Sequence, residues 1–179
     1  MAYWYLYLQQ EFVYVGDAGI VEPSGKTRRH GAEVSLRYQI RPWLHWNLDV
    51  NYTDARAIEE PDGQNFIPLA PDLTLKSSLR IKHKSGIYGG LDIRYLDDRP
   101  ANEDNSIIAQ GYTITDLTIG CKFSNLEVGV QIQNLFNTDW NETQFATESR
   151  LQNETSAVEE IHFTPGTPFM LKGMIGYHF

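Results

Sequence analysis

The chain has 179 residues, of which 41% are hydrophobic and 12% aromatic, and its formal net charge is −8 at pH 7. No run of about 18 apolar residues occurs, which excludes a membrane-spanning helix. The mean hydropathy of −0.40 still allows membrane-spanning strands, because a barrel strand alternates apolar with polar side chains. The length predicts one domain or two small ones.

Eight segments alternate apolar and polar side chains with a period of two residues, which is typical of β-strands. In chain order they are Tyr3–Val15, Ala32–Ile40, Leu44–Thr53, Leu73–Lys82, Ile87–Leu96, Tyr112–Phe123, Leu126–Asn134 and Phe169–Phe179. A tilted strand of about 9–11 residues crosses the hydrocarbon of a bilayer. The segments therefore predict strands that cross a membrane.

Each segment has one apolar face, predicted to meet lipid, and one polar face, predicted to line an aqueous interior. In the first segment the predicted lipid-facing residues are Trp4, Leu6, Leu8, Phe12 and Tyr14. The charged residues of the polar faces are Glu33, Arg37, Asp49, Lys76, Arg80, Asp92, Arg94, Asp116, Lys122 and Glu127. We expect Asp92 with Arg94, and Asp49, to belong to a ladder of paired charges, because charges that are short of water need partners.

The connections between these segments alternate in length. The short ones are Arg41–Trp43, His83–Gly86 and Ser124–Asn125, and the long ones are Gly16–Gly31, Asp54–Asp72, Asp97–Gly111 and Leu135–Pro168. Outer-membrane barrels have short periplasmic turns and longer extracellular loops. The sequence thus predicts an all-β fold: a segment of an antiparallel up-and-down transmembrane β-barrel, with about eight strands and all long loops on the extracellular side.

Several stretches carry a family resemblance. Val130–Asn137 reads V-Q-I-Q-N-L-F-N, Ile67–Asp72 reads I-P-L-A-P-D, and the chain ends with G-Y-H-F at Gly176–Phe179. With Tyr112–Phe123, and in this order and spacing, they resemble the C-terminal third of the barrel of a TonB-dependent outer-membrane receptor. Val15–Glu33 also resembles a first-loop pattern in receptors of unassigned substrate. The resemblance covers nearly the whole chain.

The resemblance implies that residues 1–179 are a single β-barrel segment, the C-terminal strands of a larger barrel whose plug domain is absent from this chain. The first eight residues lack the basic segment and cleavage site of a secretory signal, which also favours a piece of a longer protein. The implied function is that of a bacterial outer-membrane receptor that binds and imports a scarce nutrient, such as a siderophore-like chelate. The substrate itself is not indicated.

The same resemblance implies the partners. They are outer-membrane lipid, the barrel-assembly machinery and, through the missing plug region only, an energy-coupling protein, with no nucleic acid. The last strand would be the one that the assembly machinery reads, and its apolar residues are Phe169, Leu171, Ile175, Tyr177 and Phe179.

Two other functions compete with this one. A self-contained eight-stranded outer-membrane barrel with a structural or adhesive role is the alternative, but both the missing signal and the resemblance weigh against it. A soluble calyx-like barrel that binds an apolar ligand would need an apolar inner face, whereas the second face here is charged.

Candidate ligand-binding residues lie in the predicted extracellular loops. Arg28 and Arg29 belong to a basic stretch that would suit an anionic ferric chelate or the phosphates of outer-leaflet lipopolysaccharide, or would only neutralise nearby acidic loops. Trp140 and Phe145 lie in the longest loop, and long loops in compact domains are often functional. The histidines are scattered, and the acidic loops lack the full spacing of a calcium loop. We therefore expect no metal site, no cofactor and no enzyme activity.

Overall fold

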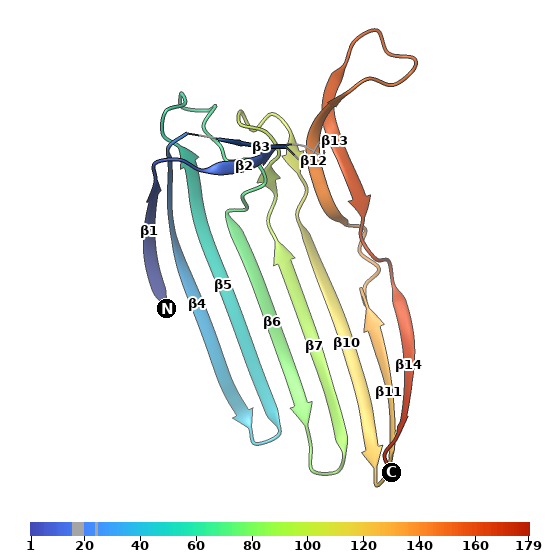
Figure 1. The fold of residues 1–179 in the computed structure, drawn as a ribbon. Coiled ribbons are helices and arrows are strands. Elements are labelled where there is room, and N and C mark those ends of the chain that lie inside the picture. The colour runs from blue at the N-terminus through green and yellow to red at the C-terminus, as the bar shows by residue number, and fades with distance from the viewer. Residues whose placement is uncertain (16–19, 24) are drawn as a thin grey trace.

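The computed structural model describes residues 1–15, 20–23 and 25–179, and in these residues the chain is all β. Eight strands form one antiparallel sheet, which Figure 1 shows as a single layer. In spatial order they are β1 (Ala2–Leu8), β4 (Thr27–Arg41), β5 (Leu44–Ala57), β6 (Leu73–Lys82), β7 (Ile87–Leu96), β10 (Tyr112–Phe123), β11 (Leu126–Gln133) and β14 (Met170–Tyr177). The predicted up-and-down topology is confirmed. In the described part of the chain, no helix is long and apolar enough to cross a membrane.

The short and long connections lie at opposite ends of the sheet. In Figure 1 the turns after β4, β6 and β10 lie at the lower end, and the long connections lie at the upper end. Gly86 and Ser124, in two of the short turns, have positive φ values of 93° and 50°. Such values suit tight hairpin turns and are easiest for glycine. The predicted alternation of turns and loops is confirmed.

The predicted first strand, Tyr3–Val15, is wrong as a single element. β1 ends at Leu8, and the chain continues into a separate hairpin of β2 (Phe12–Val15) and β3 (Ile20–Pro23). Glu11 fixes this break, because its backbone N–H donates to the Gly25 carbonyl and its carboxylate binds Thr27 and Arg29. Residues 16–19 and 24, which belong to the predicted first loop Gly16–Gly31, lie outside the described residues.

The predicted long loops contain further regular structure. β8 (Arg99–Pro100) pairs with β9 (Ile108–Ala109), and β12 (Asn141–Ser149) pairs with β13 (Val158–Pro165). β4 begins at Thr27, inside the predicted loop Gly16–Gly31, so the last residues of that loop belong to a strand. Residues 27–33 have partners on both sides, in β1 and β5, so the hydrogen-bonded ladder extends into the predicted loop.

Cross-strand pairing separates an apolar face from a polar face. The apolar face carries pairs such as Val34–Val50, Leu36–Leu48, Leu79–Leu91, Ile119–Val130 and Val128–Ile175. Many of its side chains are exposed, and Ile175 has an exposed fraction of 84%. Soluble monomers rarely expose an apolar surface of this extent. The predicted separation of apolar from polar side chains is therefore confirmed for β4, β5, β6, β7, β10, β11 and β14, and lipid contact of the apolar face stays a prediction.

The predicted faces of β1 are reversed. Tyr3 pairs with Ala32 and Tyr5 with His30, which places the tyrosines of β1 on the apolar face of the sheet. Trp4, Leu6 and Leu8 consequently lie on the polar-face side, opposite to the prediction. Both faces of this strand are hydrophobic, so only pairing with β4 fixes its register. Phe12 lies in β2, and the side chain of Tyr14 lies outside what the structure describes.

A small core closes the long-loop end of the sheet. The I-P-L-A-P stretch folds back so that Ile67 packs against Ala55 and Ala57 of β5, and all three are buried. Leu69 takes a positive φ of 62° and donates its N–H to the Pro100 carbonyl at 2.7 Å. These contacts hold the connection between β5 and β6 against the connection between β7 and β10.

Candidate ligand-binding site

Charged side chains on the polar face pair across neighbouring strands. The ion pairs, with their N–O distances, are Arg37–Asp49 (2.8 Å), Arg80–Asp92 (2.6 Å) and Arg94–Asp116 (3.7 Å). The predicted ladder is present, but Asp92 binds Arg80 instead of Arg94. The reason is that Arg80 lies opposite Gly90, whose missing side chain leaves room for the guanidinium to reach Asp92 diagonally.

An aromatic and cationic cluster lies where this ladder meets the long loops. The rings of Trp140 and Tyr112 are 4.8 Å apart between centroids, and the Arg94 guanidinium lies 5.7 Å from the Trp140 ring. The Trp140 indole N–H donates to the Thr167 carbonyl at 3.0 Å. Its ring lies against Gly166, where any Cβ would overlap it. We call Trp140, Tyr112 and Arg94 the aromatic–arginine cluster.

The sequence alone points to Trp140 but not to its two partners as ligand contacts. Tyr112 and Asp116 are four residues apart in β10, and every second side chain of a strand points to the same face. The alternation therefore places Tyr112 on the polar face. Its contact with Trp140 joins residues 28 positions apart in sequence, and no local pattern indicates such a contact.

Trp140 is held by the root of the β12–β13 hairpin. Asn134, only 2% exposed, donates from Nδ2 to the carbonyls of Thr138 (2.8 Å) and Thr167 (3.1 Å). Its Oδ1 accepts the Thr138 N–H at 2.8 Å, and its own N–H donates to Asp116 at 2.9 Å. Asn134 also has a φ of 50°, a conformation that asparagine tolerates well. This asparagine of the N-L-F-N stretch therefore ties both ends of the hairpin to β10.

A second contact fixes the hairpin further out. Gln144, buried in β12, accepts the Gln110 N–H at 3.0 Å and donates to the Gln110 carbonyl at 2.7 Å. Its neighbour Phe145 lies on the opposite face of β12, in register with His162 of β13. Trp140 and Phe145 thus belong to one hairpin, but Trp140 contacts the sheet wall while Phe145 lies within the projecting part.

The two candidate arginines lie on opposite faces of β4. Arg29 pairs with Leu6 on the polar-face side and forms an ion pair with Glu11. Arg28 pairs with Tyr7 on the apolar-face side and is exposed. The structure therefore does not bring the two side chains together.

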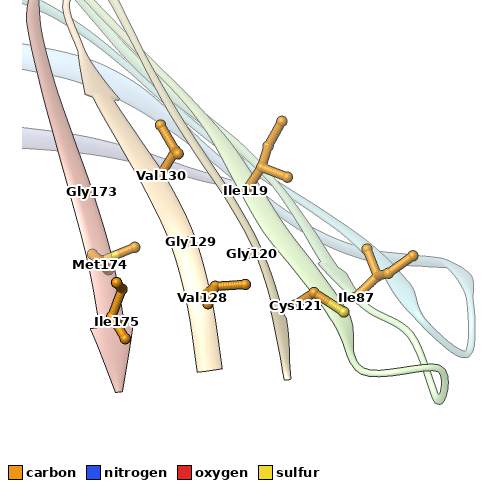
Figure 2. A pocket seen from close by; sticks show the side chains of 10 residues that line it. All are labelled: Ile87, Ile119, Gly120, Cys121, Val128, Gly129, Val130, Gly173, Met174 and Ile175. Carbon is orange, nitrogen blue, oxygen red and sulfur yellow. The ribbon is translucent and has the colours of Figure 1, made fainter. Parts of the chain in front are cut away.

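The last strand has the predicted alternation. Leu171, Ile175 and Tyr177 pair with Ile132, Val128 and Leu126 on the apolar face. Phe169 and Phe179 flank β14, and the Phe169 N–H donates to Asn137 at 2.9 Å. A shallow apolar hollow of about 890 Å³ lies beside this strand, and Figure 2 shows the side chains that line it. Gly173 opens it, because no other atom lies within 4 Å of where its Cβ would be. The hollow is continuous with the exposed apolar face.

The acidic side chains that the structure describes in the long loops do not gather into a metal site. Among the described residues, no group of three or more histidine, cysteine, aspartate or glutamate side chains is placed to hold a metal ion. Asp104 instead accepts the hydroxyl and N–H of Ser106, and these hydrogen bonds lower its pKa.

Asp72, just before β6, gives a pH-dependent prediction. Burial raises the pKa of Asp72, Arg56 opposes the shift, and Asp54 and Asp97 add to it. The folded protein therefore holds this carboxylate at a cost once the pH exceeds the unfolded pKa, and the cost disappears as falling pH protonates it. We expect Asp72→Asn to raise the unfolding midpoint at pH 7 and to leave it unchanged near pH 3.

Thermal unfolding of the detergent-folded protein at both pH values measures this effect. Asp62→Asn, at an exposed loop position, is the matched control. A lower midpoint for Asp72→Asn at pH 7 would show that the carboxylate is stabilising, contrary to this assignment.

Comparison with known proteins gives a consistent result. The family described as TonB dependent receptor-like, beta-barrel, matches residues 1–135. The chain is similar to the ferric-catecholate import receptor Fiu from E. coli K12 in its closed form, with 20% identity and a TM-score of 0.71. It is also similar to the siderophore receptor PiuA from Acinetobacter baumannii and to the copper transporter OprC, each with 14% identity and a TM-score of 0.69.

These alignments take in almost the whole chain but a minor part of each relative. They cover 98%, 97% and 99% of this chain, and 24% of Fiu, 25% of PiuA and 29% of OprC. The chain thus spans about a quarter of the length of the solved structures that it matches.

Proposed function

This chain belongs to the TonB-dependent receptor-like β-barrel family, whose members lie in the bacterial outer membrane, and we propose that it forms part of a receptor that imports a scarce nutrient. The proposed cargo is a siderophore-like metal chelate or a similar small molecule. The similar structures include receptors described for ferric catecholate, siderophore and copper, which supports a metal-containing cargo without fixing its identity. In the same proposal, residues 1–179 are the C-terminal strands of the larger barrel.

The observation that carries this proposal is the aromatic–arginine cluster. Trp140 and Tyr112 provide flat aromatic surfaces, and Arg94 provides a cation that is about half exposed. Aromatic faces suit planar organic groups, and guanidinium suits the negative charge of many chelates. The cluster lies at the long-loop end of the polar face, where a ligand from outside would first meet the interior wall.

The geometry supports a cargo contact for two of the other three candidate residues, Arg29 and Phe145, and not for Arg28. Arg29 lies on the polar-face side, and Phe145 lies in the hairpin above the cluster, so both are suited to contact cargo. Arg28 lies on the apolar-face side, which offers no support for a cargo contact and suits the headgroup region of the outer leaflet.

The proposed partners follow from the barrel architecture. Outer-membrane lipid would cover the apolar face, and the barrel-assembly machinery would read the last strand through Phe169, Leu171, Ile175, Tyr177 and Phe179. The energy-coupling protein would act through a plug region that is not among these strands. The alternative, a self-contained eight-stranded barrel with a structural or adhesive role, would need β1 to pair with β14, and these strands form opposite edges of the sheet.

Replacing Trp140 tests the proposed cargo site. Trp140→Ala removes the ring that contacts both Tyr112 and Arg94, and we expect cargo affinity to fall by about fivefold or more, since stacked aromatic contacts contribute roughly 1 kcal/mol beyond area burial. The measurement is uptake of radiolabelled iron, supplied as a ferric-catecholate chelate, by cells that produce the whole receptor.

Trp43→Ala is the matched control, because Trp43 contacts His83 at the opposite, short-turn end of the sheet. Equal uptake by the Trp140→Ala and wild-type receptors, at subsaturating chelate and equal surface amounts, would remove the support that this cluster gives to the proposal.

A further inference from the structure

Arg99 is a buried cation without a counter-ion among the described residues. It is the first residue of β8, and only 8% of its surface is exposed. Its Nη1 atom is fully shielded and has no hydrogen-bond partner, and no carboxylate in the described part of the chain lies within ion-pair distance of it. Buried charges are almost always paired, because removing an ion from water is costly.

The neighbouring carboxylate is already engaged. Asp98 precedes Arg99 in the chain, and its Oδ1 accepts the Gly111 N–H at 2.7 Å. Burial lowers the pKa of the Arg99 guanidinium, and Tyr112 and Asp98 oppose this shift. Arginine nevertheless stays protonated in proteins. A positive group with an unused donor is therefore held in the β8–β9 hairpin.

Arg99 adjoins the proposed cargo site. The carboxylate of Asp98, which precedes Arg99, accepts the N–H of Gly111, and Gly111 directly precedes Tyr112. The Tyr112 ring packs on Trp140, which lies beside Arg94, so two guanidinium groups belong to this end of the sheet. The two differ in access, because Arg94 is 45% exposed at its side chain whereas Arg99 is nearly enclosed.

We propose that Arg99 is the anchor of a separate anion subsite, which takes a planar carboxylate carried by the cargo. The guanidinium fork matches two carboxylate oxygens geometrically, and its Nη1 donor has no other partner. Arg94 and the aromatic rings hold the body of the cargo, and Arg99 selects those cargoes that carry a carboxylate arm. This inference rests on the proposed function, since it assigns a chemical class to the ligand of the same site.

The test uses sodium formate, the smallest planar carboxylate, as the probe. The membrane-purified, detergent-folded protein is titrated with formate, and with chloride at equal ionic strength, while the thermal unfolding midpoint is followed. We expect a saturable, formate-specific rise in the wild type. The half-saturating concentration should rise by about tenfold or more in Arg99→Gln, because charge-assisted hydrogen bonds contribute about 1.5–3 kcal/mol.

Two further variants make the result specific. Arg99→Lys keeps the charge without the fork and should bind formate more weakly than the wild type, whereas Arg150→Gln, at an exposed loop position, should respond like the wild type. An unchanged response in Arg99→Gln overturns the proposal. So does a wild type without any formate-specific shift, which would mean that another segment of the protein satisfies this cation. The titration of the wild type with formate needs no variant, so it tests the proposal even if Arg99→Gln fails to fold.

Failure of this inference differs from failure of the proposed function. A receptor that imports no chelate but keeps the Arg99-dependent formate response would contradict the transport proposal alone. Normal Trp140-dependent chelate uptake without that response would contradict the anion subsite alone.

Discussion

Val130→Arg is expected to prevent stable assembly in the membrane, whereas Gln131→Arg at the next position is expected to be tolerated. Val130 lies near the middle of β11 on the apolar face, between Ile119 and Gly173 of the adjacent strands. An arginine on the lipid face at mid-membrane depth costs about 2–4 kcal/mol in transmembrane barrels. Figure 2 shows Val130 on the same side as Ile119, where a charged group would meet only apolar side chains.

Gln131→Arg is the matched control, because Gln131 lies between Thr118 and Lys172 on the polar face. Urea unfolding of the detergent-folded variants and their heat-modifiable migration in electrophoresis measure the difference. Equal stability of the two arginine variants would mean that the two faces of β11 meet similar surroundings.

Asn134→Ala is expected to lower the free energy of unfolding by about 2–4 kcal/mol and to release the β12–β13 hairpin. The substitution removes three side-chain hydrogen bonds and leaves the Thr138 N–H without its partner, and each buried unsatisfied group costs about 1–3 kcal/mol. Alanine is also unfavourable at a φ of 50°. Loss of the hairpin root would free Trp140 from its position beside Tyr112.

Asn134→Asp separates these contributions. It keeps the Oδ1 acceptor for the Thr138 N–H and tolerates the backbone conformation, but it loses the Nδ2 donor. We expect an intermediate stability and partial protection of the hairpin from protease. Protease resistance of Asn134→Ala equal to that of the wild type would contradict a role for this residue at the hairpin root.

The alternation of side chains was sufficient to predict the sheet. In β5 every second residue from Leu44 to Tyr52 is apolar, and the residues between are polar, so only one orientation in a membrane satisfies both faces. The same pattern failed in β1, where Tyr3 and Trp4 are both aromatic. Pairing with β4 decides that register, and the interfacial preference of tyrosine is consistent with the outcome.

The loops were the least predictable part. Their length indicated function, but the hairpins β8–β9 and β12–β13 depend on contacts between distant residues, such as Gln144 with Gln110. Local sequence does not specify such pairs. The burial of Arg99 has the same origin, because nothing in the sequence around residue 99 distinguishes an enclosed arginine from a solvated one.

The candidate site was predicted only in part. Trp140 was identified from loop length and lies in the aromatic–arginine cluster, whereas Arg94 was assigned to the charge ladder with the wrong partner. Arg94 binds Asp116 because strand register, and not spacing along β7, sets which charges meet. Its contact with Trp140 arises only when the hairpin root brings residue 140 back to the sheet.

Collision accessibility of spin labels on adjacent residues tests the central claim most directly. Labels at Ile119 and Ile175 should collide with lipid-soluble oxygen in proteoliposomes, while labels at Thr118 and Lys172 should collide with a water-soluble nickel complex. That result would show bilayer on one side of the ribbon and water on the other. Labels at Ile119 and Ile175 shielded from oxygen, with those at Thr118 and Lys172 in contact with lipid, would contradict the membrane orientation and the proposed import function with it.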